Sequence, residues 1–292
     1  MSARDETLGF AYGILGVAAF SLTLPATRLA VADLDPIIVA LGRCAIAAIP
    51  AAALLLVART RAPARADLGS LGLVIAGVIV GFPVLTAVAM REVPATHGAI
   101  VLGVLPLATA LAAAIRGGER PSAGFWIAAI AGSALVVAYA LWQGAGSLHL
   151  ADLALLGAVV LGALGYSEGG RLARTMGAWQ VICWALVLSL PLLAVPLAWA
   201  IAKHGVNASP SAWAGFAYVA LVSQFLGFFP WYKGLALGGV ARVGQLQLLQ
   251  PFLTLAASWA LLGEQLTVPM LVFAAAVVAT VAIGRRMPVA RS

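Results

Sequence analysis

The stretch that decides the fold is LGVLPLATALAAAIRGGERPS at 102–122, which has a counterpart, LQLLQPFLTLAASWALLGEQLT, at 246–267. In both, an apolar run containing one proline leads, after the same number of residues, to a Gly-Glu pair. With the prolines aligned and no gap, the matched residues are Pro106 with Pro251, Thr109 with Thr254, Ala112 with Ala257, and Gly118-Glu119 with Gly263-Glu264. The chain therefore carries an internal repeat of one helix–loop–helix unit.

The composition places these apolar runs in a lipid bilayer. Of 292 residues, 63% are hydrophobic and only 9% are charged, whereas a soluble domain has roughly 25% charged residues. Apolar runs of roughly 20 residues recur along the whole chain, as spanning helices require and as the short alternating strands of a barrel do not. The net charge of +7 sits in short loops, where it sets orientation, so we expect no nucleic-acid partner.

The sequence predicts an all-α integral membrane protein with ten transmembrane helices. The expected spans are 8–30, 36–57, 68–89, 95–115, 123–142, 152–170, 178–201, 211–231, 237–262 and 268–284. Most connections between them are short, so successive helices should be antiparallel neighbours.

The distribution of cations predicts that both termini are cytoplasmic in a cell inner (plasma) membrane. With the N-terminus inside, the outer segments hold only Arg28, Arg91 and Lys203. The inner segments hold Arg4, Arg59, Arg61, Arg65, Arg116, Arg120, Arg171, Arg174, Lys233, Arg285, Arg286 and Arg291. This bias follows the rule that cytoplasmic loops are enriched in Lys and Arg.

The repeat predicts two halves of opposite orientation, 1–143 and 144–292, with five helices each. A second echo, Arg28-Leu29-Ala30 against Arg171-Leu172-Ala173, has nearly the same offset. Because five is odd, the halves cross the membrane in opposite senses. Inverted repeats are typical of secondary transporters, which bind substrate near the midplane between the halves.

These features, together with Arg43 in the second helix, resemble the EamA-type transporters of the drug/metabolite transporter superfamily, with the YddG amino-acid exporters as the nearest subfamily. The resemblance covers essentially the whole chain. It implies a small-metabolite exporter with alternating access to a central cavity between the first, third, fourth, sixth, eighth and ninth helices. The glutamines of QLQLLQP depart from the aliphatic residues expected there, which leaves the substrate more open than the fold.

Polar side chains inside the membrane are the first candidates for substrate contact. Arg43 could attract a substrate carboxylate, or snorkel to the outer interface and bond exposed carbonyls. Gln245, Gln247 and Gln250 lie in the ninth helix, where they could bind ligand or bond to neighbouring helices. Regular helical spacing puts Gln247 and Gln250 on one face and Gln245 nearly opposite, so the three would not share one cavity.

The eighth helix adds an aromatic wall in SQFLGFFPWYKG. Phe225, Phe228, Phe229 and Tyr232 form one helical face, and Gln224, Phe228 and Trp231 form an adjacent stripe. Such a stripe could line a substrate site or serve packing and the interfacial belt. Further lining candidates on other helices are Ser21, Thr23, Thr86, Met90, Tyr166 and Trp184.

The remaining titratable residues bear on ion coupling. His97 begins the fourth helix and could titrate near neutral pH or be an ordinary interfacial histidine. Glu168, late in the sixth helix, should pair locally with Arg171, and the other acidic residues fall at or near loops. With no carboxylate predicted at mid-membrane, uncoupled transport is favoured, and coupling through His97 or Glu168 stays open.

Other signals predict structure or exclude other functions. Gly77 to Gly81 form a GxxxG pair for close helix packing, within the fold or in a homodimer. The two Gly-Glu pairs should end one helix and begin the next. Three histidines and two apolar-run cysteines offer no catalytic or metal constellation, so neither enzyme activity, metal nor cofactor is expected. A channel is the alternative of another class, but no filter loop or ring of charge is visible.

The expected ligand is a small molecule. One cation, several amides and many aromatics suit a neutral or aromatic amino acid, while drugs, nucleobases and sugars stay open.

Overall fold

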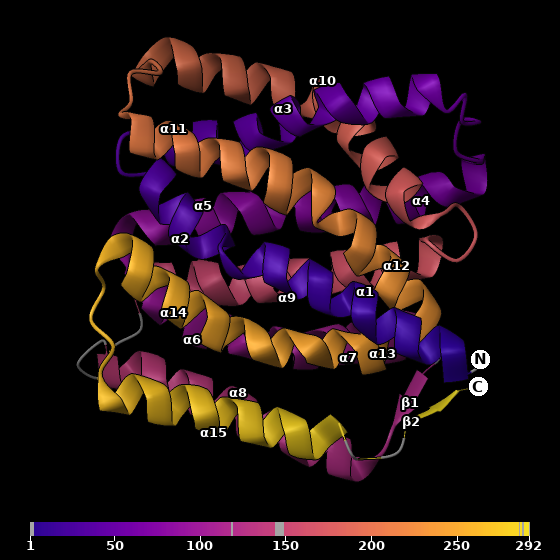
Figure 1. The fold of residues 1–292 in the computed structure, drawn as a ribbon, viewed down its shortest axis with the longest axis vertical. Helices are drawn as coiled ribbons and strands as arrows, with labels where there is room; N and C mark the ends of the chain where they lie inside the picture. Colours follow the sequence, from indigo (N-terminus) through magenta and orange to yellow (C-terminus); the bar gives the residue numbers. More distant parts are fainter. Residues whose placement is uncertain (1–2, 118, 144–148, 286, 288, 292) are drawn as a thin grey trace.

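The computed structural model describes residues 3–117, 119–143, 149–285, 287 and 289–291 (Figure 1). The ten predicted spans are largely helical there, but three of them contain a non-helical residue, Leu22, Gly227 or Gly239. The predicted start of the ninth span, at 237, is wrong, because the helix that begins at Phe228 continues to Gly238 and the next helix begins at Val240. The α-helices are α1 (Ala3–Ser21), α2 (Thr23–Ala30), α3 (Pro36–Val57), α4 (Arg65–Val74), α5 (Phe82–Glu92), α6 (Ala95–Val101), α7 (Leu105–Gly117), α8 (Ala123–Gln143), α9 (Leu150–Leu172), α10 (Ala178–His204), α11 (Pro210–Ala217), α12 (Phe228–Gly238), α13 (Val240–Gly244), α14 (Gln250–Leu262) and α15 (Val268–Arg285).

Within the described residues, seven helical stretches are long and apolar enough to cross a membrane. They are 7–30, 36–57, 65–92, 95–116, 150–172, 178–204 and 210–238. The protein is thus helical with several candidate spans, as the apolar runs predicted. It also has one small addition to the all-α expectation: β1 (Glu119–Pro121) pairs antiparallel with β2 (Val289–Arg291).

Two helices contain π-helical turns, η1 (Ile75–Gly81) and η3 (Tyr218–Leu226), each just before a proline-bearing helix. The cause is visible at Pro83, which has no N–H for either the Val78 carbonyl (five residues back) or the Ile79 carbonyl (four residues back). Both carbonyls find side-chain donors instead: Gln224 Nε2 bonds Val78 at 3.1 Å, and Cys44 Sγ bonds Ile79 at 3.2 Å. Buried carbonyls freed by proline are thus satisfied from other helices.

Two 3₁₀ turns, η2 (Leu102–Val104) and η4 (Gln245–Leu249), precede the two repeat prolines. Pro106 cannot donate to the Leu102 carbonyl, and the Leu105 N–H takes that carbonyl. In the same way Gln250 N–H bonds the Gln247 carbonyl ahead of Pro251. The two halves therefore share not only a sequence pattern but the local backbone change that a proline causes.

Glycines set the closest helix contacts. A Cβ on Gly77 would lie 2.5 Å from the Leu161 carbonyl oxygen, and one on Gly81 would clash with the Leu161 side chain. The GxxxG pair therefore packs against α9 within the fold. An unforeseen second contact joins α1 to α12, where a Cβ on Gly9 would lie 2.7 Å from the Gly238 nitrogen.

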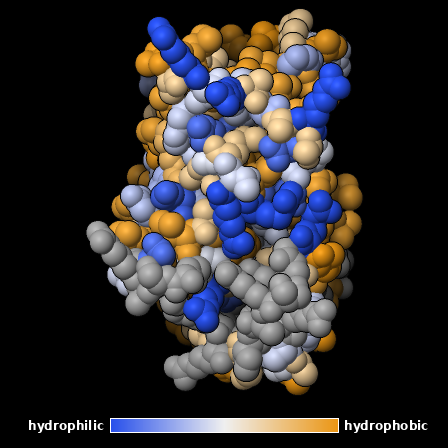
Figure 2. Space-filling model, turned by 90° about the vertical axis from the view of Figure 1, so that its right-hand side faces the viewer, coloured by the Kyte–Doolittle hydropathy of each residue, from blue (hydrophilic) through white to orange (hydrophobic). Residues whose placement is uncertain are grey.

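Both termini lie at one end of the bundle, on the right in Figure 1, together with the α3–α4, α9–α10 and α12–α13 turns. We call this the termini end, and the other the opposite end. Figure 2 looks onto the termini end and shows hydrophilic atoms across its middle with hydrophobic atoms at its sides. This is the distribution expected where a bundle meets water at its end and lipid around it.

Candidate substrate site

Arg43 is buried in the bundle, with 2% of its surface exposed. Its guanidinium donates from Nε and Nη2 to Gln224 Oε1, at 3.1 and 2.8 Å, and from Nη2 to Ser223 Oγ at 3.5 Å. Snorkelling to the outer interface and bonding to exposed carbonyls were one alternative expected for Arg43 from the sequence. The structure shows neither of these among the residues that it describes. Instead α3 is joined to the π-helical turn η3 by a charge-assisted pair.

The same network reaches two further elements. Ser223 Oγ lies 2.8 Å from Thr23 Oγ1 on α2, just after α1 ends at Ser21. Gln224 Nε2 donates to the freed carbonyl of Val78 in η1. We call Thr23, Arg43, Ser223 and Gln224 the arginine network. Among the ion pairs of the described residues, none includes Arg43, so its charge is held by neutral oxygen acceptors alone.

An aromatic cluster adjoins this network. It consists of five buried rings from α1, α9 and α12, namely Phe20, Tyr166, Phe228, Trp231 and Tyr232. Phe20 contacts Tyr166, Phe228 and Trp231 at centroid distances of 5.0 to 6.1 Å. Tyr166, which also contacts Trp231 at 5.5 Å, lies within electrostatic range of Arg43.

The aromatic face predicted for the eighth helix divides in two. Phe228 and Tyr232 join the cluster, whereas Phe225 pairs with Phe229 at 4.8 Å. Phe228 and Phe229 are successive residues of α12, and successive side chains of an α-helix point about 100° apart, so only Phe228 of the two reaches the cluster.

The ninth-helix glutamines carry buried polar atoms without a hydrogen-bond partner. These are both amide atoms of Gln247, Oε1 of Gln245 and Oε1 of Gln250, with the Trp231 indole nitrogen as a further case. Gln245 and Gln247 are 3% and 2% exposed. An unpaired buried polar group costs roughly 1–3 kcal/mol, so these amide atoms have hydrogen-bonding capacity that a ligand could use.

Contacts with α1 place these glutamines level with the aromatic cluster. Leu246 lies against Gly13 of α1, and Thr254 Oγ1 donates to the Ser21 carbonyl at 2.7 Å. Gln247 and Gln250 lie between those two contacts. On α1, Gly16 and Phe20 meet Trp231 over the same interval.

The 3₁₀ turn also alters the predicted glutamine geometry. At about three residues per turn, Gln245 and Gln247 are separated by roughly 120° rather than the roughly 160° of an α-helix. The separation that argued against a shared cavity is therefore smaller than regular spacing implied.

The weaker lining candidates lie in different places. Thr86 is buried and bonds the Phe82 carbonyl of its own helix at 2.6 Å, and the Ser21 hydroxyl bonds Val17 at 2.7 Å. Met90 is buried against Gly98 at the opposite end. Trp184 lines a pocket of about 350 Å³ near the termini end, with Arg61 and Gln180 among its other residues. These four side chains are not in the arginine network or the aromatic cluster.

His97 forms a buried pair with an acid that seemed to be a loop residue. Its Nε2 lies 2.6 Å from Asp152 Oδ1, and Asp152 is 1% exposed. The other Asp152 oxygen accepts from the His149 N–H at the start of α9. The pair lines a pocket of about 780 Å³ at the opposite end, together with Glu92, His149 and Met270.

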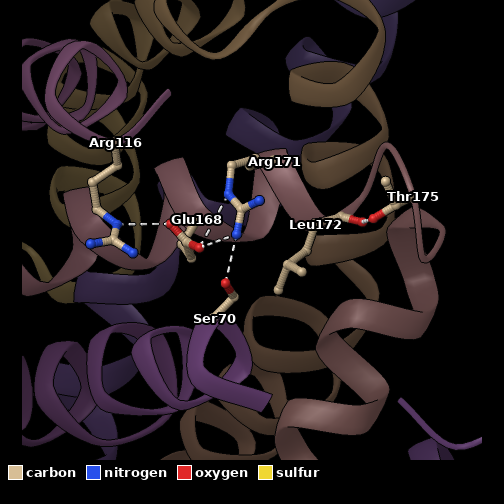
Figure 3. A network of polar contacts seen from close by, with 6 residues as sticks. All are labelled: Ser70, Arg116, Glu168, Arg171, Leu172 and Thr175. Atoms are coloured by element: carbon tan, nitrogen blue, oxygen red, sulfur yellow. Dashed lines mark hydrogen bonds and ion pairs between the residues drawn. The ribbon is translucent and has the colours of Figure 1, made fainter. Parts of the chain in front are cut away.

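Glu168 is also fully buried, at 0% exposure. Figure 3 shows it between two arginines, with Arg171 Nη2 at 2.6 Å and Arg116 Nε at 3.0 Å. Arg171 Nη2 continues to Ser70 Oγ at 2.6 Å. The predicted local pair with Arg171 is present, and the cluster additionally joins α4, α7 and α9 at the termini end.

At the opposite end, two residues hold the turn between α5 and α6, residues 90–96, which we call the α5–α6 corner. Arg28 donates from Nη1 to the carbonyls of Met90 and Arg91, where α5 ends. Glu264 accepts from the Ala95 and Thr96 N–H groups, both at 2.8 Å, where α6 begins. Cation and anion each sit at the helix end that favours its charge.

Glu264 thus caps a distant helix, whereas the sequence predicted a role at the start of its own next helix. Gly263 does end α14 in the left-handed conformation, at φ 66°. The side chain of Glu119 lies outside the described residues. Sequence reasoning also missed Phe20, Ser223 and Asp152. Two of them were adjacent to a predicted candidate, Phe20 to Ser21 and Ser223 to Gln224.

Comparison with known proteins agrees with this architecture. The EamA-like transporter family matches residues 7–139 and again residues 149–284. The chain belongs to the EamA-like transporter family. It is therefore a multi-pass membrane transporter of the drug/metabolite transporter superfamily and not an enzyme, as the sequence indicated.

Two curated relatives are similar to this EamA-like protein over most of its length. An uncharacterized transporter, YdeK of Bacillus subtilis (strain 168), is 48% identical over 97% of this chain and 99% of its own. A probable terminal-alkyne amino-acid exporter of Streptantibioticus cattleyicolor is 28% identical, over 86% of this chain and 84% of its own. A solved crystal structure shares the fold, with a TM-score of 0.68, 18% identity, and coverage of 98% of this chain and 99% of that one.

Proposed function

We propose that this EamA-like protein exports small amino acids, neutral or aromatic, by uncoupled alternating access to a site formed by the arginine network, the aromatic cluster and Gln245, Gln247 and Gln250. The observation that carries the proposal is a buried arginine that has no acidic partner among the described residues and lies beside aromatic rings and unpaired amides. A zwitterion with an apolar side chain supplies a carboxylate, hydrogen-bonding groups and an apolar surface in one molecule. The name of the Streptantibioticus relative points to the same substrate class.

The fold we propose for this activity has ten spans in two inverted halves, 1–143 and 144–292. Its support is the pairing of irregular turns: η1 with η3, and η2 with η4, each before a proline. The family also matches the chain twice. We further propose both termini on the cytoplasmic side of the plasma membrane, and a monomer or homodimer as the working unit.

The α5–α6 corner supports alternating access. Arg28 holds it from α2 and Glu264 holds it from the loop that follows α14, and we propose that both contacts separate when the carrier opens at the opposite end. The repeat equivalent of Arg28 is Arg171, at the termini end. Arg171 bonds Glu168 and Ser70 here. We propose that Arg171 changes partners and holds the α12–α13 turn when the carrier closes at that end.

The test is uptake of labelled phenylalanine into proteoliposomes, with and without an imposed pH gradient. We expect saturable uptake that the gradient does not change, and at least a 10-fold loss in Arg43→Gln. Arg65→Gln, at the exposed start of α4, is the matched control. Absence of uptake by well-folded protein would refute the amino-acid assignment, and linear, uncompeted flux would favour a channel.

Proton-coupled efflux of drugs or other metabolites is the second candidate, favoured by the buried His97–Asp152 pair in the pocket at the opposite end. Under that candidate, uptake would depend on the pH gradient, and His97→Gln would abolish the dependence. If uptake by the parent protein and by His97→Gln is the same at every pH gradient, the uncoupled carrier is favoured over the proton-coupled one.

A further inference from the structure

We infer that the amides of the ninth helix read the substrate's amino group, with Gln247 as the residue that separates amino acids from plain carboxylates. The inference rests on the proposed function and adds which part of the substrate each side of the site recognises. It begins from the unpaired atoms, which include three amide oxygens, on Gln245, Gln247 and Gln250. The two ends of a side-chain amide can exchange places by rotation, so each residue can present its oxygen.

An ammonium group is the ligand chemistry that several acceptors favour. It carries three N–H donors, whereas a carboxylate carries none. Charge also distinguishes the arginine side of the proposed site from the glutamine side. Arg43 provides a positive charge that no described acid neutralises, and this would repel an ammonium and attract a carboxylate. An amino group is therefore better placed against the neutral amides of η4 and α14 than against the arginine network.

The aromatic cluster fixes the remaining part of the molecule. Trp231 lies against Gly16, at the level where α1 also adjoins the ninth helix, and its indole nitrogen is unpaired. Tyr166 contacts Trp231 and lies within electrostatic range of Arg43. A substrate that spans from Arg43 to Gln247 would therefore cross this cluster, which suits a planar or branched apolar side chain.

Of the two repeat segments, only the one in the second half has amides that could bind an amino group. The first-half counterparts of Gln245, Gln247 and Gln250 are Ile100, Leu102 and Leu105, which are aliphatic and buried. Both segments have a 3₁₀ turn before a proline, and Leu102 and Gln247 lie in these turns, so the backbone does not require glutamine at this position. The polarity of Gln247 is thus unnecessary for the local fold, and substituting leucine reproduces a side chain that the repeat already accommodates.

The experiment measures competition for phenylalanine uptake in proteoliposomes. The competitors are unlabelled phenylalanine, 3-phenylpropanoate, which lacks the amino group, and phenethylamine, which lacks the carboxylate. For the parent protein we expect both analogues to compete at least 10-fold more weakly than phenylalanine, because each leaves one side of the site unpaired. In Gln247→Leu we expect phenylalanine and 3-phenylpropanoate to compete within about 3-fold of one another.

Two further variants keep the inference falsifiable. Gln180→Leu removes an amide near the termini end and should retain the parent's discrimination. Gln247→Glu restores an acceptor with added negative charge, and should reject 3-phenylpropanoate more strongly than the parent does. Retention of full discrimination by folded Gln247→Leu would overturn the inference. Equal competition by 3-phenylpropanoate in the parent would also overturn it, while saturable phenylalanine uptake still supported the proposed function. Absence of any uptake would refute both.

Discussion

Arg43 and Gln224 lie 181 positions apart in the chain, yet the guanidinium donates twice to one amide oxygen in the buried centre of the bundle. Gln224 is itself held by its bond to the Val78 carbonyl, which Pro83 leaves free. A backbone irregularity in one helix therefore positions the acceptor for a charge in another.

This pair predicts strong energetic coupling. Gln224→Leu should destabilise the protein by about 3–5 kcal/mol, because it leaves a buried charge without its main acceptor. Arg43→Met combined with Gln224→Leu should cost less than Gln224→Leu alone, since the charge is removed with its partner. Thermal melting in detergent of the parent, both single variants and the double variant measures this cycle; additive effects would contradict it.

The contact between Gly77 and α9 predicts opposite outcomes for two glycines of one predicted span. Gly77→Ala should lower stability by about 1–3 kcal/mol, because its Cβ would lie 2.5 Å from the Leu161 carbonyl oxygen. Gly69→Ala, in α4, meets nothing within 4 Å and should stabilise by up to about 1 kcal/mol through helix propensity. Melting temperatures that change equally in both variants would argue against the close contact.

The α5–α6 corner predicts that Glu264 keeps the opposite end closed. Glu264→Gln removes the charge at the start of α6, and a loss of about 1 kcal/mol would raise the open fraction about 5-fold. A cysteine at Ala99, buried in α6, reports opening through labelling by an impermeant maleimide; the native Cys44 and Cys183 are fully buried. Glu92→Gln, on the exposed surface of the corner, is the control. Equal labelling of the Ala99→Cys protein alone, with Glu264→Gln and with Glu92→Gln would refute the role of Glu264 in closure.

Hydrogen bonds from Ser209 to Asp33 join the start of α11 to the α2–α3 turn, and we expect the stability they provide to depend on pH. The hydroxyl and then the backbone N–H of Ser209 donate to its carboxylate and lower the pKa of Asp33 below its usual value. A lowered folded-state pKa means that the stabilisation is present above the unfolded pKa of roughly 3.9 and is lost as pH falls through the folded pKa. Asp33→Asn should therefore lower the melting temperature at pH 7 and have less effect as the pH approaches 3. Glu92→Gln serves as the exposed control, and a pH-independent difference for Asp33→Asn would contradict this reading.

The fold was more predictable than the site because hydropathy acts along each segment. The ten predicted ranges are largely helical, although the ninth includes the break at Gly239, and the prolines that define the repeat follow the turns η2 and η4. The candidate residues were harder to place. Arg43 was expected within reach of an interface and is buried, and Trp184 was expected near substrate and lines a separate pocket near the termini end.

By itself, the sequence determined that this is a helical membrane protein of the EamA-like family with an internal repeat, because apolar length and proline position are local properties of the chain. Only the tertiary structure decided which side chains and backbone groups from distant parts of the chain are paired. Glu264 caps a helix 169 positions earlier, Asp152 is buried against His97, and Arg43 meets Gln224. Which carbonyl, amide or carboxylate faces a given side chain depends on how distant helices pack, and the close approach of their backbones is set by small residues such as Gly77 and Gly9.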